Sequence, residues 1–421
     1  MIIVNRNAVK ALKLACRCAI SLLTIIFVFM SCSEDSVSPE PSPADQFPVM
    51  CISYYDNSNG DLKFSINNDG FWGEPKVVVS SVHDVGQWPS LALDAEGHPH
   101  ISYYDATRGN LKYVSENNCR CGWDIETIDF VGGIGSYASL ALDAEGQPHI
   151  SYYDGTNGAL KYAAKKSGSW IIEIIDNTGT VGTFTSLALD AQRNPHISYC
   201  DNGNKDLKYA SKTDGYWIIE TVDPDGSVGL HTSLALDTQG DPHISYCEQN
   251  LGDPSQGTLI GALKYAVRKN GRWECTLIDR ANGQFSSLIL DDQGNPHISY
   301  YTCDMHYRLN QLPFECEFSL SYIPKYAVKI DGYWIQETID EGYRNLLLRF
   351  CCCPSPFDCR CFWSMCTSIA LDASGIPYIS YYDWANGDLK CAMKVGSHWI
   401  VDTIDDEGDV GSYSSLASGH R

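Results

Sequence analysis

Short stretches of alternating hydrophobic and polar residues follow one another along most of this 421-residue chain, always in the same order. The repeating unit reads roughly S-L-A-L-D, then P-H-I-S-Y-Y-D, then L-K-Y-A, then W-x-x-E-x-I-D. Period-two alternation with many Tyr, Ile and Trp residues predicts a β-strand in each stretch. Turn sequences separate the stretches, such as Asp-Ala-Glu-Gly at 94–97 and Asn-Gly at 157–158. The unit therefore predicts a four-stranded antiparallel sheet.

All four stretches occur seven times, at a usual spacing of 47 to 49 residues. The first strand of the unit begins at Ser90, Ser139, Ser186, Ser233, Ser287, Ser368 and Ser415. The chain opens within a unit, at residues 52–56, and closes on an isolated first strand at 415–417. That last strand is the one missing from the beginning, as a closed ring requires, whereas an open β-solenoid would not need matched half-units. We predict an all-β fold: a seven-bladed β-propeller over residues 48–421, closed by the C-terminal strand pairing into the first blade.

The N-terminal segment is unlike the repeats. Basic residues precede an apolar run at 19–30 that is short for a membrane span, so residues 1–31 are expected to be a signal peptide. Ser31-Cys32 resembles the cleavage site of bacterial lipoproteins, which implies lipidation of Cys32; ordinary secretion with an incidental Cys is the alternative. Residues 32–47, rich in Pro, Ser and acidic residues, are expected to form a tether. We expect a cell-envelope protein anchored in the outer membrane by lipid alone, on its surface or periplasmic side.

The formal net charge of −22 argues against nucleic acid or anionic membrane as a partner and tolerates neutral or cationic ligands. The 25 Tyr and 10 Trp residues suit sheet packing and also the stacking of sugar rings. We expect one propeller domain, a monomer, with no cofactor and no metal.

Three lengthened connections, at 249–262, 302–323 and 341–366, occur in the fifth and sixth repeats. Because strands in a blade alternate in direction, loops between second and third strands share one face with the crossovers between blades. All three connections belong to that face, which we call the wheel face. Loops elaborated on one face of a rigid scaffold favour binding there, although neutral drift is the alternative.

A set of large residues lies two positions before the first-strand serines. Six are aromatic rings, which we call the aromatic wheel: Trp88, Tyr137, Phe184, His231, Phe285 and Tyr413. Cys366 takes the seventh position. The wheel is expected at the mouth of the axial channel, where it could stack sugars or apolar ligands; core packing between blades is the alternative. Trp384, in the seventh blade's second loop, is a further ligand-binding candidate.

Recurring polar residues have a structural interpretation. Five histidines share one position before the second strand: His100, His149, His196, His243 and His297. Neighbouring copies should lie about 10 Å apart in a ring of blades, given strand spacings of about 4.8 Å. Metal–nitrogen bonds are about 2 Å, so the five cannot converge on one ion. We expect hydrogen bonding in the adjacent turn, and expect the aspartates after Tyr-Tyr, such as Asp56 and Asp154, to cap the next turn.

The cysteines leave several possibilities open. Six crowd the sixth crossover between Cys351 and Cys366, and Cys303 and Cys316 could close the preceding insert. Disulfides, a metal site, and a disordered or mistranslated segment at 344–366 all remain possible there. Cys200 and Cys247 replace the second Tyr of the second strand and are expected to be buried thiols too far apart to bond.

The Tyr-rich strands and Gly-x-Trp turns, such as Gly168-Ser169-Trp170, resemble those of sialidase-type and lectin propellers over residues 48–418. The sialidase Asp-box and an arginine cluster are missing, so the resemblance implies no catalytic residue. Carboxylates that depart from the repeat lie in the inserts: Asp304, Glu315, Glu317, Glu341 and Asp358. We therefore expect a non-catalytic, lectin-like protein that binds glycan. A scaffold for an envelope protein is the first alternative, and a polysaccharide hydrolase or lyase the second.

Overall fold

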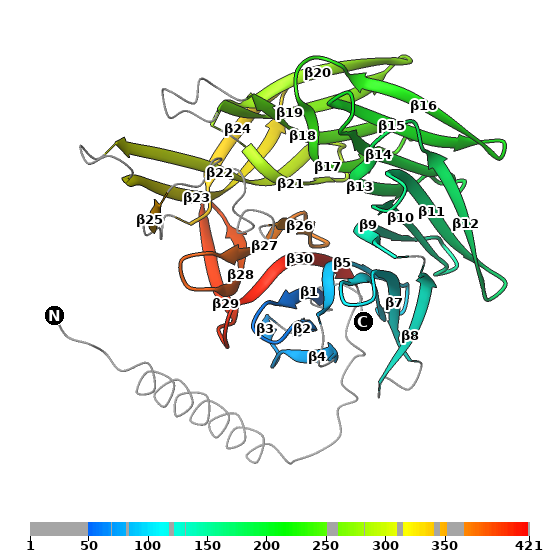
Figure 1. The fold of residues 1–421 in the computed structure, drawn as a ribbon, viewed down its shortest axis with the longest axis horizontal. Helices are drawn as coiled ribbons and strands as arrows, with labels where there is room; N and C mark the ends of the chain where they lie inside the picture. The colour runs from blue at the N-terminus through cyan, green and yellow to red at the C-terminus, as the bar shows by residue number, and fades with distance from the viewer. Residues whose placement is uncertain are drawn as a thin grey trace, which may run out of the picture. The chain divides into compact units, whose positions relative to one another are not determined.

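The computed structural model describes residues 49–419 except 69, 81–83, 118–121, 131, 251–259, 282, 310–314, 341–345 and 352–365. Of residues 250, 260, 303–321 and 346–351 only the backbone is described. The described residues belong to one compact unit, Phe47–Arg421, and their regular structure consists of β-strands in seven sheets (Figure 1). A search of them found no helix able to cross a membrane. The expected signal peptide (1–31), the tether (32–47) and Cys32 lie outside this part of the chain.

Each sheet is one blade, numbered here in chain order. The first blade contains β30 (Val410–Gly419), β1 (Val49–Asp56) and β2 (Asp61–Asn68), with an outer strand split into β3 (Phe71–Trp72) and β4 (Lys76–Val79). The second contains β5 (Val85–Leu93), β6 (Pro99–Asp105), β7 (Asn110–Glu116) and β8 (Trp123–Asp129). The third contains β9 (Ile134–Leu142), β10 (Pro148–Asp154), β11 (Ala159–Lys166) and β12 (Ser169–Asp176). The fourth contains β13 (Val181–Leu189), β14 (Pro195–Asp201), β15 (Asp206–Thr213) and β16 (Tyr216–Asp223).

The remaining three blades follow the same order. The fifth contains β17 (Val228–Leu236), β18 (Pro242–Asn250), β19 (Ile260–Lys269) and β20 (Arg272–Asp279). The sixth contains β21 (Gly283–Leu290), β22 (Pro296–Leu309), β23 (Glu315–Ile330) and β24 (Tyr333–Thr338), with β25 (Leu346–Cys351) added along β23. The seventh contains β26 (Thr367–Leu371), β27 (Pro377–Asp383), β28 (Asp388–Val395) and β29 (His398–Asp405).

The ring closes as the half-units at the two ends predict. β30 pairs antiparallel with β1, with Val49 opposite Gly419 and Ile52 opposite Leu416. The first strand of every blade contacts the first strands of both neighbouring blades, and this series of contacts returns to its starting point. The predicted seven-bladed propeller of four-stranded blades is therefore confirmed.

The hydrophobic core lies between blades rather than inside any one sheet. Each core cluster joins two neighbours; one contains Leu160 and Tyr162 of the third blade together with Leu187 and Ile197 of the fourth. Burying an aliphatic or aromatic side chain of this kind contributes about 1.5–3 kcal/mol relative to exposure. The sheets are therefore fixed to one another by the same side chains that define the repeat.

The first strands are longer than the sequence predicts. Six of the seven begin four or five residues earlier, as in β5, which starts at Val85 rather than at Ser90, whereas β26 begins at Thr367. The alternation of polar and apolar residues fails to show this, because a register shift between Gln87 and Ser90 interrupts the ladder. The wheel residues lie inside these irregular strands and not ahead of them.

The sixth-blade insert also differs from the lengthened loop that was expected. β22 and β23 extend the blade as a paired hairpin out to Leu309 opposite Cys316, and β25 pairs along it. Cys303 and Cys316 lie six residue pairs apart on this ladder, about 20 Å at strand geometry. A disulfide needs Cα atoms within about 7 Å, so the bridge considered between these two cysteines is wrong. Only the backbone is described for Asp304, Glu315 and Glu317, while Glu341, Asp358 and the segment 352–365 lie outside the described residues.

Candidate functional site

The aromatic wheel occupies a repeated irregularity of the innermost strands. All six of its rings belong to residues with positive φ: Trp88 (47°), Tyr137 (57°), Phe184 (53°), His231 (51°), Phe285 (54°) and Tyr413 (53°). Residues other than glycine rarely adopt this left-handed backbone conformation, which costs about 1–3 kcal/mol for each residue. The same strained residue in six blades is tolerated because the flanking ladder fixes it. Its effect is to turn each ring toward the axis of the propeller, where all six line one hollow.

The wheel rings contact one another around the axis. Neighbouring ring centroids are 5.2 Å apart for Trp88 and Tyr137, 4.6 Å for Tyr137 and Phe184, and 4.3 Å for Phe184 and His231. They are 4.0 Å apart for His231 and Phe285, and 5.2 Å for Trp88 and Tyr413. Cys366 fills the gap between Phe285 and Tyr413 by sequence position and lines the same hollow. These contacts are favourable aromatic pairs, so packing between blades is one role of the wheel.

The hollow at the axis is small. Its volume is about 190 Å³, and the first-strand serines line it together with the rings. Each serine accepts a hydrogen bond from the backbone of the next blade; Leu140 N donates to Ser90 Oγ at 3.0 Å, and Leu91 N to Ser415 Oγ at 3.0 Å. Ligand pockets are usually about 300–1,000 Å³, so a sugar chain would rest on the mouth of this hollow and not enter it.

The wheel carries no charge at neutral pH. Burial lowers the pKa of His231 to about 3 and raises the pKa of the Cys366 thiol to about 12. Burial likewise raises the pKa of Tyr137 and Tyr413. Except for the buried Phe285, the wheel rings remain partly exposed. The result is a neutral, aromatic platform on the wheel face, suited to stacking and not to holding a metal ion. Ligand contact by these residues stays a prediction.

A second set of tyrosines surrounds the wheel. Tyr104 lies 5.5 Å from Trp88 and Tyr153 lies 6.4 Å from Tyr137, measured between ring centroids. Two others lock a blade to the crossover that follows it. The Tyr55 hydroxyl donates to Asp84 at 2.8 Å, and the Tyr382 hydroxyl donates to Asp409 at 2.7 Å.

Trp384, the remaining candidate, contacts the sixth blade. Its ring lies 6.0 Å from that of Tyr322 in an edge-on arrangement, and it packs against a core cluster that includes Phe285 and Tyr382. It is therefore a partly buried packing residue that touches the same cluster as the wheel residue Phe285. Ligand contact by Trp384 is not tested by this arrangement.

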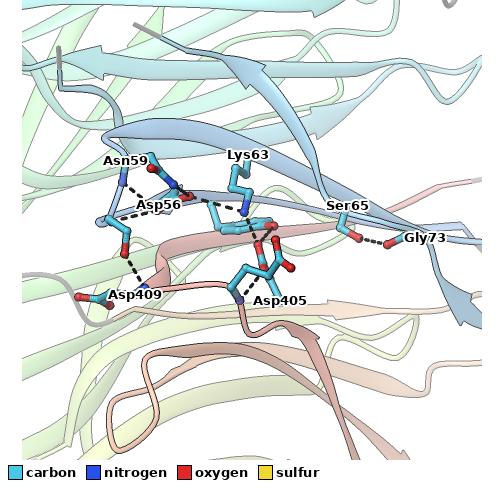
Figure 2. Close-up of polar contacts among 10 residues, drawn as sticks. Asp56, Asn59, Lys63, Ser65, Gly73, Asp405 and Asp409 are labelled. Carbon is cyan, nitrogen blue, oxygen red and sulfur yellow. Dashed lines mark hydrogen bonds and ion pairs between the residues drawn. The ribbon is translucent and has the colours of Figure 1, made fainter. Parts of the chain in front are cut away.

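Buried ion clusters hold the seams between blades. At the seam of the seventh and first blades, the Tyr54 hydroxyl and the Lys63 ammonium both donate to one oxygen of Asp405, at 2.7 and 2.6 Å (Figure 2). Lys63 also lies 3.5 Å from Asp56, whose other oxygen accepts from the backbone N–H of Ser58. The predicted role of the Asp56 series as turn caps is confirmed. Equivalent Tyr–Asp bonds are Tyr152–Asp129, Tyr199–Asp176, Tyr246–Asp223, Tyr300–Asp279 and Tyr381–Asp340.

The seam of the first and second blades lacks this cluster. Val79 pairs with Leu62 at the register position where Asp176 pairs with Leu160. Lys112 therefore has no aspartate across the seam, and among the described residues it donates to Thr127 Oγ1 at 3.1 Å instead.

The five repeated histidines are structural, as predicted. In each, Nδ1 is hydrogen-bonded to a tyrosine hydroxyl of the third strand, as in His243 with Tyr265 at 2.5 Å and His297 with Tyr326 at 2.6 Å. Nε2 faces the aspartate that begins the preceding turn; for His243 this is Asp237 at 3.5 Å. Burial lowers the pKa of all five imidazoles. They are neutral, and their hydrogen bonds stabilise the turns on the face opposite the wheel.

One group in the described chain has the spacing of metal ligands. Donor atoms of Asp94, Glu96 and His98 lie within 4.8 Å of one another in a turn of the second blade. Asp94 already accepts from the backbone N–H of His98 at 2.7 Å and faces its Nδ1 at 3.0 Å. The cluster is thus explained as a capped turn.

A larger cavity lies beside the wheel and was missed from the sequence. Its volume is about 410 Å³, and it lies at the seam between the fourth and fifth blades. Its lining residues are Cys200, Asn202, Lys205, Gly226, Ser227, Val228, Leu230 and Gln249. The signal was the replacement of Tyr by Cys at position 200. Cys200 and Cys247 are free, buried thiols, as expected, but the space left by the missing ring could not be seen from the sequence.

Comparisons with known proteins show the fold. No protein-family model and no curated protein matches the chain. Similar solved structures include a polysaccharide lyase described as a PL25 ulvan lyase, 16% identical, covering 87% of this chain and 91% of that one, with a TM-score of 0.50. A putative 6-phosphogluconolactonase from Bacteroides uniformis is 10% identical, covers 88% and 99%, and gives 0.52. A leech intramolecular trans-sialidase is 10% identical, covers 64% and 67%, and gives 0.39.

These structures correct one expectation from the sequence. The expectation of a non-catalytic protein is contradicted, because the similar propellers are named as enzymes. Its basis was the lack of any short catalytic motif. In a propeller, side chains from different blades meet on one face although they are far apart in sequence, so a short motif is not needed. The similarity to sialidase and polysaccharide lyase propellers is a distant similarity of fold.

Proposed function

We propose that this protein acts on a polysaccharide that lies across the wheel face. The observation that carries the proposal is the aromatic wheel: six rings in contact around the axis, uncharged and mostly part-exposed. Sugar rings stack on such surfaces through their apolar C–H faces. The fold similarity to a polysaccharide lyase supports the same class of substrate.

The groups best placed to move protons lie beside the first blade. Asp409 is exposed, and it accepts from Tyr382 at 2.7 Å and from Asn57 Nδ2 at 3.2 Å. Asp84 accepts from Tyr55 and, at 2.8 Å, from Gln87 Nε2. Burial and the neighbouring aspartates raise the pKa of Tyr55 and Tyr382, so both phenols stay protonated and hold Asp84 and Asp409 through their hydrogen bonds. An aspartate base positioned by a tyrosine hydroxyl, as at these two seams, is an arrangement that glycan cleavage can use.

The test is a polysaccharide panel incubated with the full chain, read for binding, for new reducing ends and for unsaturated products. Trp88→Ala should remove binding while the circular dichroism spectrum is kept. Asp409→Asn should remove product formation and leave binding in place. A folded sample that neither binds nor cleaves any polysaccharide would overturn the proposal.

We further propose that the chain is held at the cell envelope by a lipid on Cys32. The support is the Ser31-Cys32 motif after an apolar run. Cells expressing the full chain should incorporate labelled palmitate into it, and Cys32→Ala should abolish the label and release the protein from the membrane fraction. Label retained by Cys32→Ala would contradict the proposal.

A further inference from the structure

In the first and seventh blades, the second tyrosine of the second strand has a defined place at the seam between two blades. Tyr55 of the first blade reaches Asp84, the residue just before β5 of the second blade. Tyr382 of the seventh blade reaches Asp409, the residue just before β30 of the first. Both rings are 6% exposed. At these two seams, a tyrosine ring fills the space under the crossover and its hydroxyl closes the contact.

The fourth blade has a smaller residue at this place. Cys200 stands where the first and seventh blades have Tyr55 and Tyr382, and Ser227, just before β17, stands where they have Asp84 and Asp409; the fifth blade has Cys247 at the same place. The Cys200 thiol contacts Asn202 Oδ1 at 3.4 Å and the carbonyl of Val228 at 3.8 Å, and it leaves the space of the ring unfilled. Removing a ring from a packed seam leaves a cavity unless the backbone collapses. The backbone has not collapsed here, and the cavity of about 410 Å³ is within the range of ligand pockets.

Several polar side chains line this cavity. No hydrogen bond or ion pair joins the Lys205 ammonium, the Ser227 hydroxyl or the Gln249 side-chain amide to any described residue. Asn202 Nδ2 uses one proton on Thr183, at 2.8 Å, and keeps the other. Most polar groups near this face are engaged, as Asp84 and Asp409 illustrate. An ensemble of one ammonium, one hydroxyl and two amides around a ring-sized space matches a sugar ring with several oxygens.

The charge of the lining selects among sugars. Lys205 is the one charged residue among those lining the cavity, and it is exposed on the wheel face. A carboxylate is the group on a sugar that an ammonium stabilises most, through a charge-assisted hydrogen bond. The net charge of −22 repels anions at a distance, but ionic strength screens that repulsion beyond about 8–10 Å. The contact with Lys205 is much shorter and decides local selectivity.

The cavity adjoins the aromatic wheel along one strand. Val228 and Leu230 of β17 line the cavity, and His231 of the same strand belongs to the wheel. Three residues of strand span about 10 Å. One polysaccharide chain can therefore occupy both.

We propose that the seam between the fourth and fifth blades binds one uronic-acid ring of the polysaccharide, with its carboxylate on Lys205 and its ring in the space that a tyrosine fills at other seams. This inference rests on the proposed function and assigns it a substrate class, a polysaccharide that contains uronate. The site needs no metal. Burial raises the pKa of the Cys200 thiol to about 12, so the thiol stays protonated and only lines the cavity.

The experiment uses single sugars, so that polymer linkage does not matter. Saturation-transfer NMR on the full chain should detect D-glucuronate or D-galacturonate binding, and binding of D-glucose and D-galactose should be at least about tenfold weaker, as expected for losing one charged hydrogen bond. Cys200→Tyr, which installs the residue found at other seams, should abolish uronate binding. Cys200→Ser, the matched control, keeps the cavity open and should bind like the parent.

Two further variants separate this site from the wheel. Lys205→Gln leaves the core untouched and should weaken uronate binding about tenfold without affecting D-glucose. Trp88→Ala should lose polysaccharide binding yet keep the single uronate, so a failure of the wheel proposal is distinguishable from a failure of this one. No uronate binding by the parent chain, or equal binding by parent and Cys200→Tyr, would overturn the inference.

Discussion

Two seams of this propeller each lack what the other has. Between the first and second blades, Tyr55 fills the wheel-face position and bonds to Asp84, but Val79 stands where a buried aspartate is expected. Between the fourth and fifth blades, Cys200 leaves the wheel-face position open, but Asp223 holds Tyr246 and Lys264, both at 2.6 Å. A seam therefore needs either the tyrosine–aspartate bond on the wheel face or the buried aspartate cluster, and not both. The wheel-face position is free to become a binding cavity wherever the buried cluster is present.

The largest effect is expected from removing the buried cluster of the open seam. Asp223→Ala removes the acceptor of the Tyr246 hydroxyl and leaves Lys264 with only Glu248, at 3.6 Å, and breaking a buried ion pair in this way costs about 3–5 kcal/mol. Urea unfolding followed by tryptophan fluorescence should show the loss in the free energy of unfolding. If Asp223→Ala costs less than about 1 kcal/mol, the cluster does not hold this seam and the comparison fails.

A smaller effect should follow from opening the filled seam. Tyr55→Cys copies the fourth blade and removes a buried ring together with its bond to Asp84, at an expected cost of about 2–4 kcal/mol. A crystal structure of the variant should show a second cavity at the seam of the first and second blades. Tyr55→Phe, which keeps the ring, should cost only about 1 kcal/mol. Equal costs for the two variants would mean that the hydroxyl, and not the ring, closes the seam.

Acid should weaken the second and fifth blades alike, because each has a largely buried imidazole at the same position before its second strand. Burial lowers the folded-state pKa of His100 and His243 below the ordinary value of about 6.5. The unfolded chain therefore binds protons more readily, so stability is complete above about pH 6.5 and is lost as the pH falls below it. Melting temperatures measured from pH 7.5 to 5 should decline, and His243→Gln should make the decline shallower. An unchanged slope in His243→Gln would show that the imidazole does not carry the effect.

The smallest effect belongs to the lysine that has no aspartate. Lys112→Ala removes only the contact with Thr127, and the free energy of unfolding should change by less than about 1 kcal/mol. Lys264→Ala at the other seam is the matched comparison and should cost several times more, because it leaves Asp223 buried without its cation. Similar costs at the two positions would show that the seams do not differ in this respect.

Repetition explains how much of the fold could be predicted. Seven copies of the strand pattern and the matching half-units at residues 52–56 and 415–417 were enough to predict the blades and the closure of the ring. The role of the five histidines also followed, because distances in a ring exclude a shared ion. The true start of β5 at Val85 could not be read, since the register shift before Ser90 breaks the alternation.

The site was less accessible to sequence reasoning because its contacts join distant residues. The wheel positions were predicted. The direct contact between the rings of Phe184 and His231, however, depends on a left-handed backbone conformation at both residues, and their residue types do not predict that conformation. The replacement of Tyr by Cys at position 200 was visible, yet the cavity requires Ser227 and Gln249, which reach it from other strands. Candidate carboxylates in the inserts, the anchor and the glycan itself remain predictions.

The pairing of β1 with β30 means that the two ends of the propeller are register neighbours, Val49 opposite Gly419. A force applied between these ends would peel the strands apart one hydrogen bond at a time, beginning with the terminal pair, and would not shear the whole ladder at once. The same proximity means that a short peptide could join the ends and new termini could be cut at another turn. Such a circular permutant would keep all seven blades. Only the blade that contains both ends of the chain would change.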